Sequence, residues 1–256
     1  MTIRYQAPSV KKAFQILSLI TRSDRGMGVS DLARHLELSK STVHGITAAL
    51  EELGAIIRDP ATKHYTAGLT LLELGKSAYS QFDLKDLARP VMEDLMAHSQ
   101  ESVFLGVLNG DRVTILDVVE STNDLKITSP VGTTIPLMAA ATGKVFLAAK
   151  DEHRLMEMIS SRGLVKFTEN TITDPDLFVK EIEHVRENGY ATDYEEYILG
   201  VRAVASPITG NKDYRSAIWV VGFKTSLDDD KMQTLIRETK RAAARISDRL
   251  RERTLS

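Results

Sequence analysis

Cysteine is absent from the 256-residue sequence, and tryptophan occurs once. The lack of cysteine excludes disulfides, thiol nucleophiles and thiolate zinc sites, although histidine and carboxylate sites stay open. No apolar run approaches the roughly 20 residues that a membrane span needs, and the N-terminal segment MTIRYQAPSVKK lacks the apolar core of a signal peptide. We therefore expect a cytoplasmic protein without a membrane partner.

A large excess of charge of either sign is also missing, because 33 Lys and Arg residues stand against 35 Asp and Glu residues. The charges are unevenly placed, however. Residues 1–70 carry nine basic and six acidic side chains, a net charge of +3, and the remainder carries −5. An excess of three supports phosphate binding only weakly by itself. The length exceeds one typical domain of roughly 100 to 200 residues, which predicts two domains.

Helical spacing of apolar residues predicts three short helices at the N-terminal end. Ser9, Ser30 and Ser39 can each cap one of these helices, and Gly54 ends the third. The runs AIIR and HYTA, separated by the turn DPATK, then predict two short antiparallel strands. Helix, helix, turn, helix and hairpin together indicate a winged helix-turn-helix. A further apolar-periodic helix over 69–79 precedes one that ends near His98.

The remainder mixes strands and helices. Asn109 and Gly110 join two strand-like runs and give a strong hairpin signal. We expect strands over 102–108, 112–119, 200–208 and 216–224, helices over 142–149, 151–161, 174–188 and 228–253, and a polar loop over 209–214. Antiparallel strands grouped with helices are typical of an α+β domain of the kind that senses small molecules.

The segment VSDLARHLELSKSTVHGITAALEELG supplies both helices of a helix-turn-helix, in which the second helix enters the major groove. Lys40 and His44 are four residues apart and share one helix face. Hydroxyl groups beside them can donate to bases or phosphates, and the free N–H groups at Ser39 favour phosphate. The candidate DNA-binding residues are Ser30, Ser39, Lys40, Ser41, Thr42, His44, Thr47, Arg58 and Lys63. A winged helix that only contacts protein remains an alternative.

Five segments carry a family resemblance over nearly the full length: SVKKAFQIL, VSDLARHLELSKSTVH, HYTAGLTLLELG, IPLMAAATGKVFLA and GYATDYEEYILGVRAVASPI. On these segments the chain resembles the IclR family of bacterial transcription regulators. The resemblance implies a DNA-binding winged helix-turn-helix, a linker helix and a GAF-like effector-binding domain, in dimers or tetramers on a palindromic operator. We accordingly expect domain boundaries at 1–68, 69–83 and 84–256, the last domain also serving oligomerisation.

One position departs from the family pattern. Where the family usually carries Arg after the recognition-helix His, this chain has Gly45. A glycine inside a helix costs about 0.5 to 1 kcal/mol relative to alanine. It also removes one phosphate or base contact, so we expect the operator sequence to differ from those of relatives.

The resemblance also implies an effector site. Carried over position by position, the site residues are Ile127, Ala141, Thr142, Asp193, Ala203, Trp219 and Val221. Thr142 lies at a predicted helix start, where free N–H groups can hold a ligand carboxylate. Small-acid sensors of the family tend to have Cys or Ser at the positions that Ala203, Trp219 and Val221 occupy in this chain. The replacements leave fewer hydrogen bonds for a compact acid, so we expect a carboxylate with an apolar or aromatic body. Trp219 could equally be a core residue.

Other chemistries find little support in the sequence. Asp193, Glu195 and Glu196 could form an acid and base pair or bind a metal, but such a DYEE cluster is more often a solvated loop. The histidines show no metal-ligand spacing, and no G-x-S-x-G elbow is present. We therefore expect no metal and no cofactor. The leading hypothesis is a ligand-controlled regulator, more often a repressor in this family, and the alternative is an enzyme that converts a small molecule.

Overall fold

The computed structural model describes residues 7–80, 83–210 and 215–255. The chain divides into two compact units, with the division between residues 82 and 83. Residues 81–82 of the expected linker and 211–214 of the expected polar loop lie outside the described residues. No helix in the described ranges is long and apolar enough to cross a membrane.

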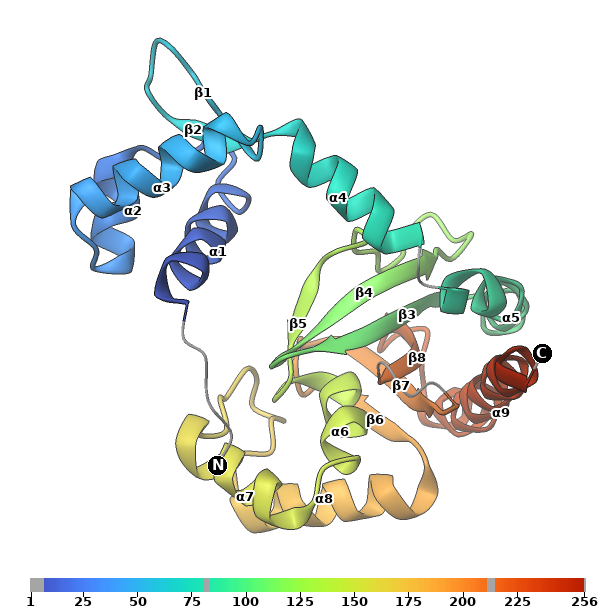
Figure 1. The fold of residues 1–256 in the computed structure, drawn as a ribbon. Coiled ribbons are helices and arrows are strands. Elements are labelled where there is room, and N and C mark those ends of the chain that lie inside the picture. The colour runs from blue at the N-terminus through green and yellow to red at the C-terminus, as the bar shows by residue number, and fades with distance from the viewer. Residues whose placement is uncertain (1–6, 81–82, 211–214, 256) are drawn as a thin grey trace. The chain divides into compact units, whose positions relative to one another are not determined.

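The first unit is a winged helix-turn-helix followed by one more helix (Figure 1). Its elements are α1 (Pro8–Ile20), α2 (Val29–Leu36), α3 (Lys40–Glu52), β1 (Ile56–Arg58), β2 (Tyr65–Ala67) and α4 (Leu69–Ser80). The three N-terminal helices and the hairpin bury a common core that includes Ile16, Leu32, Val43 and Ile56. β1 and β2 pair antiparallel, which confirms the predicted wing.

Two of the three predicted helix caps are wrong. Helix α1 begins at Pro8, because the proline ring presets the backbone angle of a first helical residue, and Ser9 lies inside the helix. Helix α2 begins at Val29 after an extended Gly28, so Ser30 also lies inside it. Ser39 is a cap as predicted, since its side chain accepts a hydrogen bond from the Thr42 amide at 3.1 Å.

The second unit contains a six-stranded antiparallel sheet in the order β5-β4-β3-β8-β7-β6. Its strands are β3 (Ser102–Asn109), β4 (Arg112–Val119), β5 (Thr134–Pro136), β6 (Ala191–Tyr194), β7 (Val201–Ile208) and β8 (Ser216–Phe223). Its helices are α5 (Asp83–Ser99), α6 (Ala140–Ala148), α7 (Glu152–Arg162), α8 (Pro175–Asn188) and α9 (Asp229–Leu255). This is the expected α+β arrangement.

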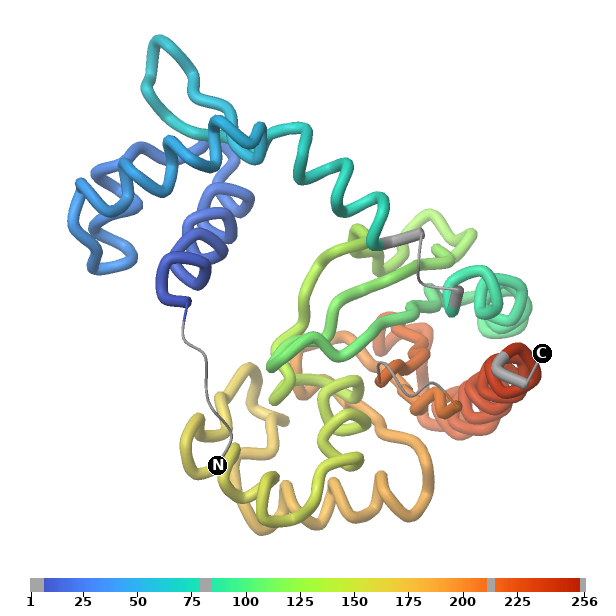
Figure 2. The backbone as a smooth tube through the Cα atoms, in the orientation of Figure 1, coloured from blue at the N-terminus to red at the C-terminus, as the bar shows by residue number. Residues whose placement is uncertain are grey.

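Helices cover both faces of this sheet. α5 and α9 contact each other and pack on one face, as the backbone trace in Figure 2 also shows. α6 packs on the opposite face against β6, β7 and β8, with α8 behind it. The sheet and α6 therefore enclose a layer in which side chains of the strands meet the start of a helix.

Two short strands were not predicted. β5 has three residues and pairs with the edge of β4, and β6 has four residues and pairs with β7. Strands this short do not contain enough residues to establish an alternating pattern. β6 has a functional consequence, because it takes part of the acidic segment expected to be a solvated loop and places Asp193 opposite Ala203 in the sheet.

Candidate functional site

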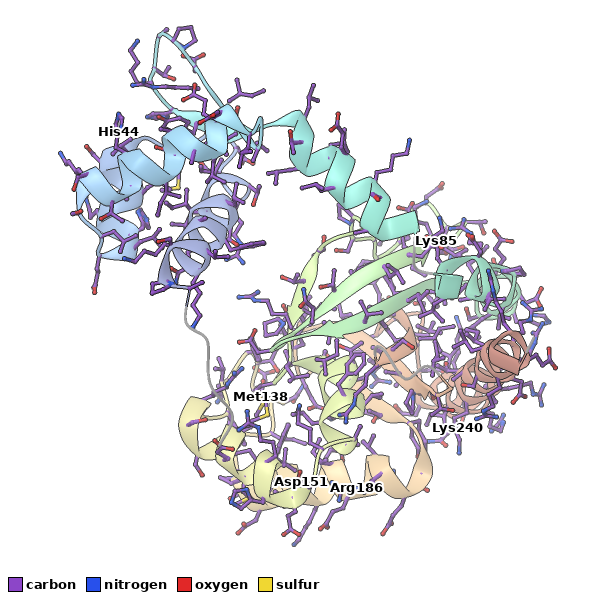
Figure 3. The ribbon with its side chains drawn as sticks, viewed as in Figure 1. His44, Lys85, Met138, Asp151, Arg186 and Lys240 are labelled. Atoms are coloured by element: carbon purple, nitrogen blue, oxygen red, sulfur yellow. The ribbon has the colours of Figure 1, made fainter. Side chains whose placement is uncertain are left out.

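Helix α3 presents a polar, exposed side at its N-terminal end. Lys40, Ser41 and His44 are exposed there, and Figure 3 shows His44 projecting outward from α3. The Ser39 hydroxyl lies 3.0 Å from that of Ser41 and 2.8 Å from that of Thr42. Hydroxyl groups are thereby held beside a cationic side chain at a helix N-terminus, an arrangement suited to an anion or to base edges.

Thr47 does not belong to this exposed side. It is 0% exposed, and its hydroxyl donates to the His44 carbonyl oxygen at 3.1 Å. The physical reason is helical spacing, because Val43, Thr47 and Leu50 are the buried residues of α3 and follow one another at four and three positions. The prediction that Thr47 contacts DNA is therefore wrong.

The other candidate residues of the first unit are exposed. Ser30 is exposed on α2, and Arg58 and Lys63 are exposed on the wing. Asp59 fixes the turn between the two strands, because its carboxylate accepts the Thr62 amide at 2.7 Å and the Ala61 amide at 2.9 Å. The hydrogen bonds from Thr62 hold the pKa of Asp59 below its ordinary value.

Gly45 lies beside His44 on the exposed side of α3. A Cβ atom added there would meet no atom within 4 Å. The helix therefore has open space at this position, and the glycine is not required by packing.

A cavity of about 260 Å³ in the second unit is lined by all seven effector-site residues that the family resemblance implied. They reach it from β6, β7, β8, the start of α6 and the segment before β5. Further residues line the cavity that neither the sequence pattern nor the resemblance indicated: Phe104, Ile115, Thr128, Ser129, Thr133, Thr134, Ile135, Ala140, Tyr197, Ile198 and Val201. A strand pairing that the sequence does not specify brings several of these together.

Trp219 forms part of the wall of this cavity and is also part of the core. Its ring stacks on Phe104 with centroids 5.6 Å apart and planes 9° apart, because the two residues are opposite each other on β8 and β3. A Cβ atom at Gly106 would lie 2.7 Å from the Trp219 ring, so the glycine leaves the space that the indole occupies. The two interpretations of Trp219, wall and core, therefore both hold.

The first turn of α6 borders the same cavity. Ala139 precedes the helix, and the Gly143 amide makes its bond to the Ala139 carbonyl at 3.2 Å. The amides of residues 140–142 have no carbonyl oxygen within the helix to which they could donate, because the helical acceptor lies four residues earlier. Thr142 is 2% exposed, and its hydroxyl has no hydrogen-bond partner among the described residues. An unsatisfied buried hydroxyl and free amides thus meet at one end of the cavity.

Asp193 borders the cavity as well and is 4% exposed. Its carboxylate accepts a hydrogen bond from the Glu196 amide at 2.6 Å. Burial raises the pKa of Asp193 to about 6, and the nearby Glu196 carboxylate adds to the rise. Asp193 is therefore a carboxyl group that changes charge close to neutral pH.

The charge of Lys144 on α6 opposes the rise in the pKa of Asp193, and Lys144 is 3% exposed. Its ammonium donates to Glu196 at 2.6 Å, to the Thr192 carbonyl at 3.0 Å and to Glu181 at 3.1 Å. Burial raises the pKa of Glu196 despite this partner. The expected solvated DYEE loop is therefore a buried, ion-paired segment, in which Glu195 turns away to Lys224 at 2.7 Å. Across the described ranges, no group of three His, Asp or Glu residues could hold a metal ion.

Two family models match the chain. The IclR helix-turn-helix domain matches residues 9–60, and the bacterial transcriptional regulator IclR C-terminal domain matches residues 76–248. Among curated relatives, the HTH-type transcriptional regulator KdgR of Escherichia coli K12 is 30% identical over 93% of this chain and 91% of its own. The HTH-type transcriptional repressor AllR of the same strain is 28% identical over 92% of this chain and 88% of its own.

Solved structures share the whole architecture. An IclR transcriptional regulator from Alicyclobacillus acidocaldarius has a TM-score of 0.82 at 28% identity, covering 95% of this chain and 99% of that one. An IclR homologue from Microbacterium hydrocarbonoxydans, solved with 4-hydroxybenzoate, has a TM-score of 0.76 at 23% identity, covering 95% and 99%. The relatives are named as regulators and not as enzymes, and the chain belongs to the IclR family of bacterial transcriptional regulators.

Proposed function

We propose that this regulator represses transcription in the cytoplasm from a palindromic operator, and that a small carboxylate with an apolar or aromatic body controls it. Residues 1–68 bind DNA, 69–83 transmit the signal, and 84–256 bind the effector and oligomerise. The observation that carries the proposal is one cavity whose wall combines apolar side chains with an unpartnered, buried Thr142 hydroxyl at a helix start.

The exposed side of α3 supports the DNA partner. Ser39, Lys40, Ser41 and His44 are exposed at the N-terminal end of the helix that occupies the recognition position, and Thr42 is half-buried beside them. Ser30, Arg58 and Lys63 lie on the flanking elements and are candidates for backbone phosphates. The relative AllR, a named repressor, favours repression over activation.

A homodimer, or a homotetramer built from dimers, is favoured by apolar side chains that the described first unit leaves exposed. Val10 and Phe14 on α1 are 55% and 67% exposed. On α4, Leu69, Leu72 and Leu74 are each more than 60% exposed. Monomeric proteins rarely expose large apolar side chains in such groups, whereas a second copy of the same helices would cover them.

The lining of the cavity supports the proposed ligand class. Ala203, Val221 and the stacked Trp219 give it a flat apolar wall, which suits an aromatic or aliphatic body. The free amides at the start of α6 and the Thr142 hydroxyl can receive a carboxylate. The 4-hydroxybenzoate bound to one structural neighbour belongs to the same class of compound.

A gel shift tests the regulator. DNA from upstream of the protein's own gene is titrated with wild type and Lys40→Ala at two salt concentrations. We expect specific binding by the wild type that weakens steeply with salt, and weaker binding with a smaller salt dependence for Lys40→Ala. Thr47→Val is the matched control on the buried side of α3 and should bind as the wild type does. If neither this DNA nor a genomic selection yields a specific site, the proposal is wrong.

A further inference from the structure

The described lining of the cavity contains one carboxyl group and no basic side chain, although the proposed ligand is an acid. Of its lining residues that the structure describes, Asp193 is the only one with an ionisable acidic or basic side chain other than the phenol of Tyr197. None of them is lysine, arginine or histidine. A ligand carboxylate placed at the start of α6 would therefore meet a carboxyl group in the same small cavity and no cation.

The ammonium whose charge acts on Asp193 is already engaged. Lys144 donates to Glu181, Glu196 and the Thr192 carbonyl and does not line the cavity. Counted with Asp193, the group holds three carboxyl groups around one ammonium. The group is mostly buried, with exposed side-chain fractions of 3% for Lys144, 14% for Glu196 and 27% for Glu181.

The other charged groups near β6 point elsewhere. Arg202 is opposite Tyr194 in the sheet, on the face away from Asp193, and pairs with Asp229 at 2.8 Å. Glu195 is buried and pairs with the exposed Lys224 at 2.7 Å. No described partner is therefore left to neutralise a second negative charge beside Asp193, and two carboxylates so close cannot both stay ionised at low cost.

We propose that the cavity takes a monocarboxylate together with one proton, which is held by Asp193, so that Asp193 faces the ligand as a neutral acid that can donate a hydrogen bond. This inference rests on the proposed function and specifies the ligand class further. It excludes dianionic ligands, and below about pH 6, where Asp193 is largely neutral, it excludes cationic ligands of the same shape. Burial, which raises the pKa of Asp193 to about 6, makes the proton available near neutral pH.

Proton uptake by Asp193 makes the affinity for the carboxylate depend on pH. Ordinary carboxylic acids titrate near pH 4, so a simple aryl acid stays ionised above about pH 5.5. Uptake of one proton by Asp193 then lowers the affinity about tenfold for each pH unit above about 6. A neutral ligand of the same shape carries no such dependence.

Three probes of nearly equal size test this: benzoate, benzamide and benzylamine. Binding is measured by titration calorimetry between pH 5.5 and 8, in two buffers of different ionisation enthalpy, with the fluorescence of Trp219 as a second readout, since it is the only tryptophan. We expect benzoate to bind tightest at pH 5.5, with close to one proton taken up at pH 7.5. Benzamide should bind weakly and independently of pH, and benzylamine should not bind at pH 5.5.

Two variants identify the group. Asp193→Asn mimics the neutral acid, so benzoate should bind it with little pH dependence and without proton uptake. Glu195→Gln changes the neighbouring carboxylate that pairs with Lys224 and should keep the wild-type profile. Circular dichroism of each variant before titration excludes misfolding as the cause of any change.

The outcomes separate this inference from the proposed function. Benzoate binding that is independent of pH, or that keeps its pH dependence in Asp193→Asn, overturns proton uptake and leaves the carboxylate effector intact. Benzylamine binding at pH 5.5 that Asp193→Asn abolishes shows that Asp193 acts as an anion at this pH, and overturns the inference. If benzoate binds neither protein at pH 5.5, the aryl carboxylate and the inference are both wrong, whereas DNA binding still stands on its own test.

Discussion

The ammonium of Lys144 lies 2.6 Å from a carboxylate oxygen of Glu196, and the two side chains are only 3% and 14% exposed. This pair ties α6 to the segment after β6, two parts of the chain about 50 residues apart that both border the cavity. Lys144 is therefore a positioning residue for the acidic side of the site.

Removing this lysine should be costly. Lys144→Met leaves Glu196 and Glu181, whose side chains are 14% and 27% exposed, without their cation, and we expect a loss of about 3 to 5 kcal/mol in the free energy of unfolding. Arg245→Met removes the partner of Asp94, but both of these side chains are about half exposed, so we expect a change of at most about 1 kcal/mol. Urea unfolding of both variants checks the difference. Equal losses would show that burial of Lys144 has no energetic consequence.

Stability should depend on pH through Asp193. Its pKa is raised above the ordinary value of 3.8 to about 6, so the folded protein binds more protons than the unfolded chain between these values. Stability from this group therefore falls as pH rises through that window and stays reduced above it. At pH 8, Asp193→Asn should have a free energy of unfolding up to about 3 kcal/mol higher than that of wild type, with no such gain at pH 4. Urea unfolding at the two pH values measures the difference. A pH-independent difference would contradict the raised pKa.

Gly106 should be required for the placement of Trp219. A Cβ atom there would lie 2.7 Å from the indole, so Gly106→Ala should displace the ring and cost about 1 to 3 kcal/mol. The emission of Trp219, the only tryptophan, should shift at the same time. Gly75→Ala on α4, where a Cβ meets nothing within 4 Å, is the matched control and should leave the emission unchanged. An unshifted emission for Gly106→Ala would contradict the packing described.

Gly45 should be replaceable. Because a Cβ atom there meets no neighbour, Gly45→Ala should raise stability by about 0.5 to 1 kcal/mol without weakening DNA binding. Gly45→Arg places a cation on the exposed side of α3 and should steepen the salt dependence of DNA binding by about one unit. Thermal unfolding and gel shifts at several salt concentrations measure the two effects. A DNA affinity lowered by Gly45→Ala would mean that the glycine allows a close approach to the backbone of DNA.

Sequence patterns predicted the long elements well and failed where tertiary contacts decide. Alternation and helical spacing identified α3, α9, β3 and β8, whereas β5 and β6 depend on pairing with a neighbour. Thr47 was assigned from its side-chain type, although its spacing from Val43 and Leu50 already indicated burial. Lys144 was missed because a lysine in an apolar helix gives no indication of three partners that lie 37 to 52 residues further along.

Some residues of the candidate cavity could likewise be predicted from the sequence, and others could not. Its seven residues were found through the family pattern, and the structure brings them to one cavity. Phe104 could not be found this way, because its place depends on the register that sets it opposite Trp219. The charge of Asp193 also depends on burial, which an isolated DYEE segment does not reveal.

Ligand control of DNA binding can be measured by the anisotropy of a labelled operator fragment. Benzoate is titrated at pH 6 into complexes of wild type and of Thr142→Val, which removes the unpartnered hydroxyl. We predict that saturating benzoate changes the DNA affinity of wild type by about fivefold or more, and that Thr142→Val needs a higher benzoate concentration for the same change. If benzoate binds in the cavity of wild type and the DNA affinity does not change, ligand control of DNA binding is contradicted.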